Sequence, residues 1–374
     1  SHHPAFPLTR AHMPTGYGIC LRDYTSGGTV RIPNDFGPAQ PLDGFDPDYR
    51  NIVDYIVRIT HRIWETDAKG VAYIGDCYSP DSLVFDDYGL QRGNAKIIAD
   101  THHTTGAFPD IVLDAEEVIW AGDDKVGFHT SHLTRITGTN DGPSRYGPPT
   151  QQKINVPVIA NCVALGNDIF FEHVLYNTSA MLMQLGLDLW AEAGRLCQDP
   201  PPGWPRSQTV WSALRAGLRP PRPLCEAEPV DGFDPDRFAR DVHDDIWNRD
   251  GALIDTAYAA DVPFEGTTCR TFAGTSALRG YVDAIRTAFP DMVLQVDEVY
   301  WMGNDAEGWL ISTRWSADAT HAGGGLYGDP TEAPVQIWGI TQQRVLGGQV
   351  QQEWQLFNEF DLMMQISKAR LGSG

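Results

Sequence analysis

The chain has 374 residues, of which 42% are hydrophobic and 21% charged, a balance typical of a globular protein with room for two domains. Its net charge of -21 argues against nucleic acid and against an anionic membrane surface as partners. No apolar run approaches the roughly 20 residues that span a bilayer. The six cysteines are scattered without a C-x-x-C pair, which favours reduced thiols and a cytoplasmic location.

The N-terminal part of the chain contains an arm and a first repeat. Residues 1–44 are rich in Gly, Pro and aromatic residues, so we expect an arm that is ordered only by contact with a domain or a neighbouring subunit. The first repeat occupies residues 45–196, and its periodicity predicts helices over 93–107, 178–194 and the segment after Phe45-Asp46-Pro47-Asp48. Alternating apolar runs predict strands near 111–120, 125–137, 153–164 and 168–177.

A linker and a second repeat follow. The linker, residues 197–232, is rich in proline, which predicts a stiff, extended spacer with little regular structure. The second repeat, residues 233–374, predicts helices over 235–249 and 275–288 and strands near 292–301, 308–318, 334–345 and 349–358. Helices that precede an antiparallel meander indicate an α+β fold, because no βαβ alternation occurs.

The two repeats are similar in sequence as well as in pattern. Ala107-Phe108-Pro109-Asp110 recurs as Ala288-Phe289-Pro290-Asp291, and Glu172 with Asn177 recurs as Glu353 with Asn358, always 181 positions apart. Two copies of so long a unit indicate two whole domains, since a solenoid needs three or more short units. A polar group that only one copy keeps is therefore a candidate for function.

The order of elements and several motifs resemble the NTF2-like superfamily and, within it, the SnoaL-like polyketide cyclase group. The motifs are Phe-Pro-Asp before the first long strand, Tyr146-Gly147-Pro148-Pro149-Thr150 with Glu172-His173, and Thr320-His321-Ala322-Gly323 with Tyr327-Gly328-Asp329-Pro330-Thr331 and Glu353-Trp354. The resemblance covers both repeats but neither the arm nor the linker. It implies two tandem cone-shaped α+β barrels, each around one pocket. We expect them to pack as an internal pseudo-dimer, and a homodimer of the whole chain stays open.

The candidate catalytic residues lie in the first repeat. Taking the face of Trp354 and Leu356 as the inner one, alternation along the last strand directs His173 and Asn177 into the first cone. We predict His173 or His132 as the base, because an imidazole among apolar neighbours can act as a proton shuttle. Asp86 would orient the base or act as acid, and Tyr176 with Asn177 would hold a developing oxyanion.

Five further residues are predicted to bind the substrate. Thr101 and Thr104 are polar where the equivalent helix of the second repeat is apolar, which indicates a pocket wall. Tyr73 and Tyr78 can donate a hydrogen bond to a substrate oxygen. Trp120, in the recurring Trp120-Ala121-Gly122, completes the set.

These residues predict a cofactor-independent acid–base enzyme of the lyase, isomerase or cyclase type. Its substrate would be a small oxygenated organic molecule, aromatic ones included, held in the first cone, while the second cone would be a degenerate scaffold. Two alternatives stay open. Asparagine stands at 177 and 358, where the resembled family often carries aspartate, and this favours a non-catalytic binding module. A metal-dependent enzyme is the other, although His129 and His132 face opposite ways on a strand and we predict no metal ligands.

Overall fold

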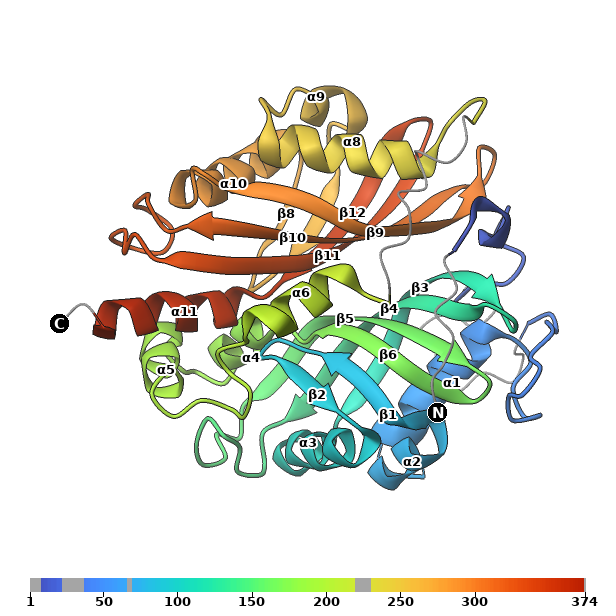
Figure 1. Ribbon diagram of the computed structural model, residues 1–374, viewed down its shortest axis with the longest axis horizontal. Coiled ribbons are helices and arrows are strands. Elements are labelled where there is room, and N and C mark those ends of the chain that lie inside the picture. Colours follow the sequence, from blue (N-terminus) through green and yellow to red (C-terminus); the bar gives the residue numbers. More distant parts are fainter. Residues whose placement is uncertain (1–7, 22–36, 66–68, 219–229, 373–374) are drawn as a thin grey trace. The chain divides into compact units, whose positions relative to one another are not determined.

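The computed structural model describes residues 8–21, 37–65, 69–218 and 230–372, and the chain divides into two compact units. Domain 1 comprises Ser1–Tyr176 and Ala180–Asp188, and domain 2 comprises Asn177–Ser179 and Leu189–Gly374. Each domain contains a six-stranded sheet with helices (Figure 1). The predicted α+β class with two tandem domains is confirmed.

Domain 1 builds its sheet in the order β2-β1-β6-β5-β4-β3, antiparallel except for the parallel pair of β1 and β6. Its elements are η1 (Arg10–His12), α1 (Ile52–Trp64), η3 (Val71–Tyr73), α2 (Ile74–Cys77), β1 (Tyr78–Phe85), β2 (Leu90–Arg92), α3 (Asn94–Ala107), β3 (Val112–Asp123), β4 (Gly127–Thr139), β5 (Lys153–Leu165) and β6 (Asp168–Leu175). Helix α1 begins where the Asn51 side chain accepts a hydrogen bond from the amide of Asp54 at 2.8 Å. It packs its apolar side on β3 and β4.

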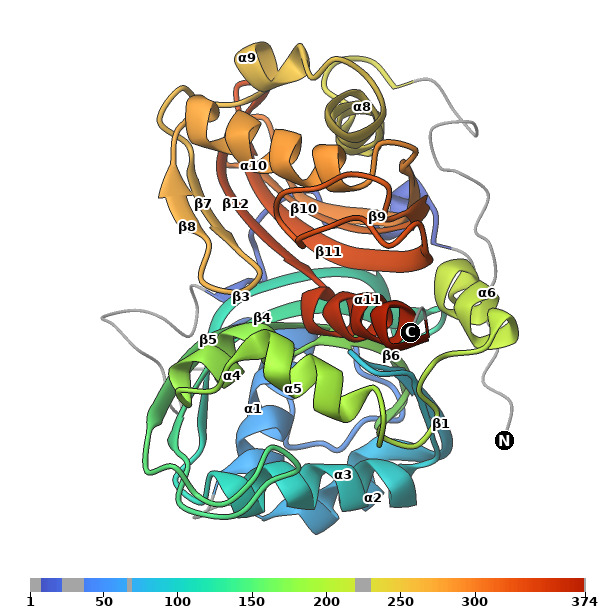
Figure 2. The same cartoon turned by 90° about the vertical axis from the view of Figure 1, so that its left-hand side faces the viewer.

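Domain 2 repeats this order as β8-β7-β12-β11-β10-β9. Its elements are α5 (Leu189–Leu196), α6 (Gln208–Ala216), α8 (Pro235–Asn248), α9 (Leu253–Ala257), β7 (Pro263–Gly266), β8 (Thr271–Ala273), α10 (Thr275–Ala288), β9 (Val293–Asn304), β10 (Gly308–Thr320), β11 (Pro334–Leu346), β12 (Gln349–Phe357) and α11 (Glu359–Gly372). Helices α8 and α10 cover one face of this sheet, while α6 and α11 lie on the other (Figure 2).

The helices and long strands that the sequence predicts are present, but several segments differ. The predicted helix over 178–194 is two helices, α4 (Thr178–Gln184) and α5, because Gly186 between them has a φ of 81°, in the left-handed region. The linker contains α6 and is not wholly extended. The strands β1, β2, β7 and β8 and the helices α2, α9 and α11 are absent from the sequence prediction. Four linker prolines (Pro220, Pro221, Pro223, Pro229) lie outside the described residues.

The described part of the N-terminal arm contacts β3 of domain 1. The indole Nε1 of Trp120 donates a hydrogen bond to the carbonyl of Ile19 at 3.0 Å, and η1 packs against β3. Trp120 therefore anchors the arm, and its polar atom is already used.

The β3–β4 turn imposes a strict requirement for glycine. Gly122 has a φ of 95°, and an added Cβ would lie 2.1 Å from the carbonyl oxygen of Gly127. We therefore expect Gly122→Ala to lower the free energy of unfolding by about 1–3 kcal/mol in urea denaturation. Gly75→Ala, where no atom lies within 4 Å of the added Cβ, is the control. Equal stability of both variants would contradict the strain argument.

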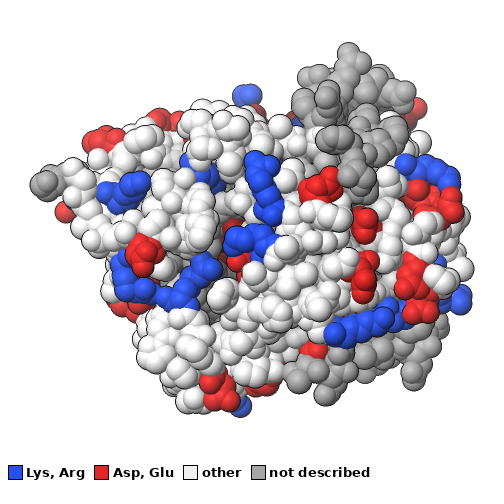
Figure 3. All heavy atoms as spheres, turned by 60° about the horizontal axis from the view of Figure 1, so that its bottom comes forward, with Lys and Arg blue, Asp and Glu red and all other residues white. Residues whose placement is uncertain are grey.

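Two general properties of the described residues bear on the sequence predictions. Of the helices in the described ranges, none combines the length and apolar composition that crossing a bilayer requires. Cys20, Cys77, Cys162, Cys197 and Cys269 are free thiols, and Cys225 lies outside the described residues. On the face shown in Figure 3, acidic and basic side chains are interspersed among uncharged ones.

Candidate active site

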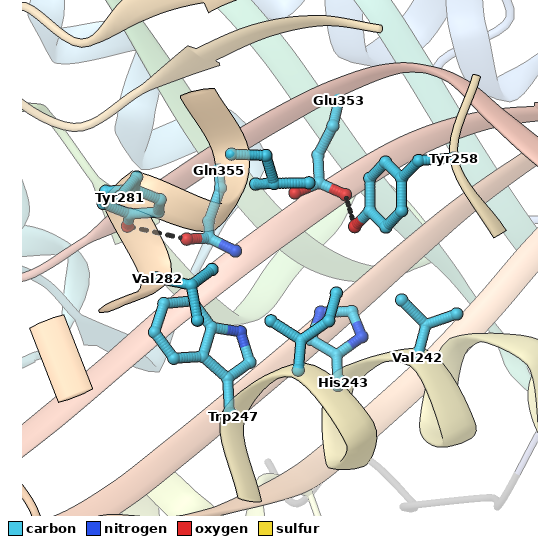
Figure 4. A pocket seen from close by; sticks show the side chains of 10 residues that line it. Val242, His243, Trp247, Tyr258, Tyr281, Val282, Glu353 and Gln355 are labelled. Carbon is cyan, nitrogen blue, oxygen red and sulfur yellow. Dashed lines mark hydrogen bonds between the residues drawn. The ribbon is translucent and has the colours of Figure 1, made fainter. Parts of the chain in front are cut away.

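In domain 2 the face of the sheet that is turned toward α8 and α10, here called the helix-side face, encloses a cavity (Figure 4). Its volume is about 10 Å³, close to the room that one water molecule needs. The strand β12 contributes Glu353 and Gln355 to its wall, and α8 contributes His243 and Trp247. Trp354, which the sequence analysis assigns to the inner face, does not line it.

Glu353 is a buried carboxyl group with two hydrogen-bond donors on one oxygen. The Tyr258 hydroxyl and the Gln343 Nε2 each donate to its Oε1 at 2.6 Å. Burial raises the pKa of Glu353 to about 7, although both hydrogen bonds oppose the shift. Near neutral pH this carboxyl group can therefore either give or take a proton.

His243 is a neutral imidazole with both nitrogens bonded. Its Nδ1 donates to the carbonyl of Ala239 at 2.7 Å, so its Nε2 accepts from the Thr341 hydroxyl at 3.2 Å. Burial lowers the pKa of His243 to about 4. The imidazole thus has no remaining hydrogen-bonding capacity for a ligand in this arrangement.

The raised pKa of Glu353 predicts a pH dependence of stability. Because the folded pKa of about 7 exceeds the ordinary 4.5, the folded state keeps a proton that the unfolded state has released. The free energy of unfolding should therefore fall by about 3 kcal/mol between pH 4.5 and pH 7 through this group alone. Urea denaturation across this range should show the fall in the wild type, and Glu353→Gln should flatten it. A Glu353→Gln profile that equals the wild-type one would contradict the assignment.

Domain 1 carries the same carboxyl–phenol pair. The Tyr78 hydroxyl donates to Oε1 of Glu172 at 2.5 Å, and the Cys162 thiol lies 3.3 Å from the same oxygen, where Gln343 stands in domain 2. Burial raises the pKa of Glu172, and Tyr78 and Cys162 oppose the shift. Tyr78 is thus a partner of a buried acid. It lies on the face of the domain 1 sheet that is turned toward α1, which we call the helix-side face of domain 1.

Helix α1 contributes a histidine that the sequence analysis did not select. His61 is 3% exposed, and its Nδ1 lies 2.8 Å from Oε1 of Glu65 one turn later. A carboxylate accepts from N–H, so Nδ1 carries the proton and Nε2 presents its lone pair. This Nε2 is buried and has no partner among the described residues. One sequence signal could have identified His61. The residues Asp54, Arg58 and His61 recur with the same spacing as Asp236, Arg240 and His243.

His132 lies on the same helix-side face. It sits on β4 opposite Ala160 of β5, and its neighbour on that face, Thr130, stands opposite Cys162. Burial and, to a smaller extent, the nearby His61 lower the pKa of His132 to about 3. The imidazole is therefore neutral, and its buried Nε2 has no partner in the described ranges.

The prediction that His173 and Asn177 point into the cone is wrong. Glu172 occupies the helix-side face, so the adjacent His173 points to the other one, stacked on Phe85 with ring centroids 5.0 Å apart. Asn177 has a φ of 51°, and its amide bonds the backbone of Thr268 in both directions, at 2.7 and 3.2 Å. The predicted alternation along the strand is correct, but the predicted inner face is the wrong one.

The remaining catalytic candidates lie near the end of β1. Asp86 accepts hydrogen bonds from the amides of Tyr88 and Gly89, both at 2.9 Å, and from the Gln91 side chain. It therefore closes the β1–β2 turn, and burial raises its pKa. It is not paired with His173. Burial is the largest cause of the raised pKa of Tyr176, and the negative charge of Glu172 is the second. The phenol therefore lies close to this carboxyl group.

The predicted substrate-binding residues are dispersed. Tyr73 shares a hydrogen bond of 2.7 Å with Tyr49, whose hydroxyl also accepts from Arg62. Thr101 is buried and donates to its own helix at the carbonyl of Ile97, while Thr104 is half-buried. Among the described residues, no group of three or more His, Cys, Asp or Glu side chains is placed to hold a metal ion.

Comparison with known proteins identifies the second domain. Residues 237–366 match the family model of SnoaL-like polyketide cyclases. The match to this family thus lies entirely within domain 2. Domain 1 repeats the strand order and the carboxyl–phenol pair of this SnoaL-like domain.

Three solved structures of similar proteins are each covered almost completely by about a third of this chain. A protein assigned as a SnoaL-like polyketide cyclase from Jannaschia sp. CCS1 is 16% identical, over 36% of this chain and 98% of its own, with a TM-score of 0.33. IdmH from Streptomyces antibioticus, assigned as a polyketide cyclase, is 19% identical over 36% and 99%, with a TM-score of 0.31. A SnoaL-like polyketide cyclase from Agrobacterium tumefaciens C58 is 12% identical over 36% and 99%, with a TM-score of 0.30. No curated protein matches the chain.

Proposed function

We propose that the protein is a cofactor-independent acid–base enzyme of the lyase, isomerase or cyclase type, with its reaction in domain 1. The substrate would be a small oxygenated organic molecule with an acidic C–H bond next to a carbonyl group. The family of domain 2 supports the reaction class, since its name denotes cyclases. The observation that carries the proposal is the pair of buried, unpartnered imidazole nitrogens of His61 and His132 in the described part of the chain.

Comparison of the two domains supports domain 1 as the reactive one. Where domain 1 has the His61–Glu65 pair, the α8 helix of domain 2 has His243 followed one turn later by Trp247. His243 is fully bonded inside its own domain, whereas His61 keeps a free lone pair among the described residues. A buried polar atom without a partner costs about 1–3 kcal/mol, so two in one place favour a ligand that satisfies them.

The residues suggest a division of roles. His61 would take the proton from carbon through Nε2, because Glu65 holds its Nδ1–H and stabilises the imidazolium that forms. His132, kept neutral by burial, would hydrogen-bond the carbonyl oxygen as negative charge develops on it. Glu172, with its raised pKa, would return a proton to the product.

Exchange of carbon-bound protons in D₂O tests the proposal at its first step, whichever product follows. We would incubate the protein with a panel of small aliphatic and aromatic ketones and follow loss of the α-proton signal by ¹H NMR. We expect exchange in the wild type, loss in His61→Gln and retention in His243→Gln. Exchange that depends on His243 and not on His61 would move the site to domain 2. The absence of exchange with every ketone would favour the non-catalytic binding module over the enzyme.

A further inference from the structure

A second pocket, outside both helix-side faces, lies within domain 2. Its volume is about 260 Å³. One wall is the segment before α6, with Trp204 and Arg206, and another is α11, with Asp361 and Lys368. The third wall consists of the adjoining ends of β10 and β11. We call this space the α11 pocket.

Both carboxylates that line the α11 pocket are already neutralised. Asp361 accepts from the Trp204 indole and from the Arg206 guanidinium, each at 2.7 Å, with both charged side chains at most 2% exposed. Asp318 pairs with Arg215 at 2.6 Å and accepts from the Trp211 indole at 3.0 Å. These contacts also hold the walls in place, so the pocket exists before any ligand binds.

Lys368 is the one charged side chain of the pocket lining that takes no part in these two ion pairs. It is exposed, and its Nζ lies 5.6 Å from the centroid of the Trp204 ring. The two carboxylates that line the pocket pair with Arg206 and Arg215, and neither forms an ion pair with this ammonium. The pocket therefore offers one available positive charge beside an aromatic ring.

We propose that the α11 pocket binds a small planar carboxylate, with the acid group on Lys368 and the ring against Trp204. The volume suits one ring with a substituent, since a cavity of about 150 Å³ holds benzene and drug-sized sites begin near 300 Å³. Apolar contact would come from Pro205 and Val335, and the amide of Gln365 stands on the same wall as Lys368. This site is independent of the acid–base chemistry proposed for domain 1.

Isothermal titration calorimetry with benzoate tests the site on the full chain. We expect a dissociation constant on the order of 1 mM, as befits so small a ligand. Lys368→Met should weaken binding at least tenfold and Lys368→Glu should abolish it, because the charge-assisted hydrogen bond is lost or reversed. Benzamide, which has the same shape without the charge, should bind at least tenfold more weakly than benzoate.

Two matched variants show whether binding is specific to Lys368 and to this pocket. Lys153→Met removes another exposed lysine, on β5, and should leave benzoate binding unchanged. His61→Gln should also leave it unchanged, because the cone of domain 1 is not involved. Benzoate that binds Lys368→Met as well as wild type, binding that is lost in His61→Gln, or no binding up to 50-fold above the expected constant would each overturn the proposal.

Discussion

Replacing Glu65 by Gln should slow α-proton exchange by about 10²–10⁴-fold, the range that general-base catalysis contributes. The carboxylate fixes the tautomer of His61 in which Nδ1 carries the proton, over a contact of 2.8 Å. An amide can instead donate to Nδ1, which shifts the proton to Nε2 and removes the lone pair that acts as base. Exchange rates from ¹H NMR measure the effect, and ¹⁵N shifts of the imidazole report the tautomer directly.

A matched variant shows whether this effect is specific. Asp100→Asn removes another acidic residue that pairs within its own helix, with Lys96 on α3, and should leave the exchange rate and the His61 tautomer unchanged. A Glu65→Gln protein with wild-type exchange would exclude His61 as an oriented base. A slow variant whose His61 tautomer is unchanged would mean that Glu65 acts only through stability.

Replacing Asp361 by Ala should destabilise domain 2 by about 3–5 kcal/mol, the cost of leaving a buried charge without its partner. The carboxylate receives Trp204, Arg206 and the Asn358 amide, all at 2.7 Å, and it is 1% exposed. Its removal takes away the carboxylate that pairs with the buried Arg206 guanidinium. Urea denaturation followed by tryptophan fluorescence measures the loss.

Two comparisons test whether the size of this effect depends on the burial of the ion pair. We expect a buried pair to contribute much more than an exposed one. Asp318→Ala breaks the pair with Arg215, but this carboxylate is 60% exposed, so the loss should stay at about 0–1 kcal/mol. The double variant Asp361→Leu with Arg206→Leu removes both charges and should recover most of the stability. Equal losses for Asp361→Ala and Asp318→Ala would contradict the argument.

Much of the fold could be predicted because its signals are local and occur twice. The apolar stripe of α1 and the long alternating strands need only periodicity, and the repeat supplies each element in a second copy. The strands β1 and β7 were not predicted because each pairs in parallel with the last strand of its own sheet, about 90 residues later. A pairing between segments so far apart in the chain leaves no local pattern in the sequence.

The amino-acid pattern is enough to establish two α+β domains of one type, with an acid that recurs as Glu172 and Glu353 and a histidine that recurs as His61 and His243. Which face of β6 lies on the same side of the sheet as α1 depends on packing instead. Alternation shows that neighbouring residues point to opposite faces of the sheet, but it does not show which face is turned toward the helices. Burial does not help either, because both faces are buried here: Glu172 is 5% and His173 3% exposed. Packing against the helix resolves the choice in favour of Glu172, and it also brings His61 to His132, which lie 71 positions apart in the chain.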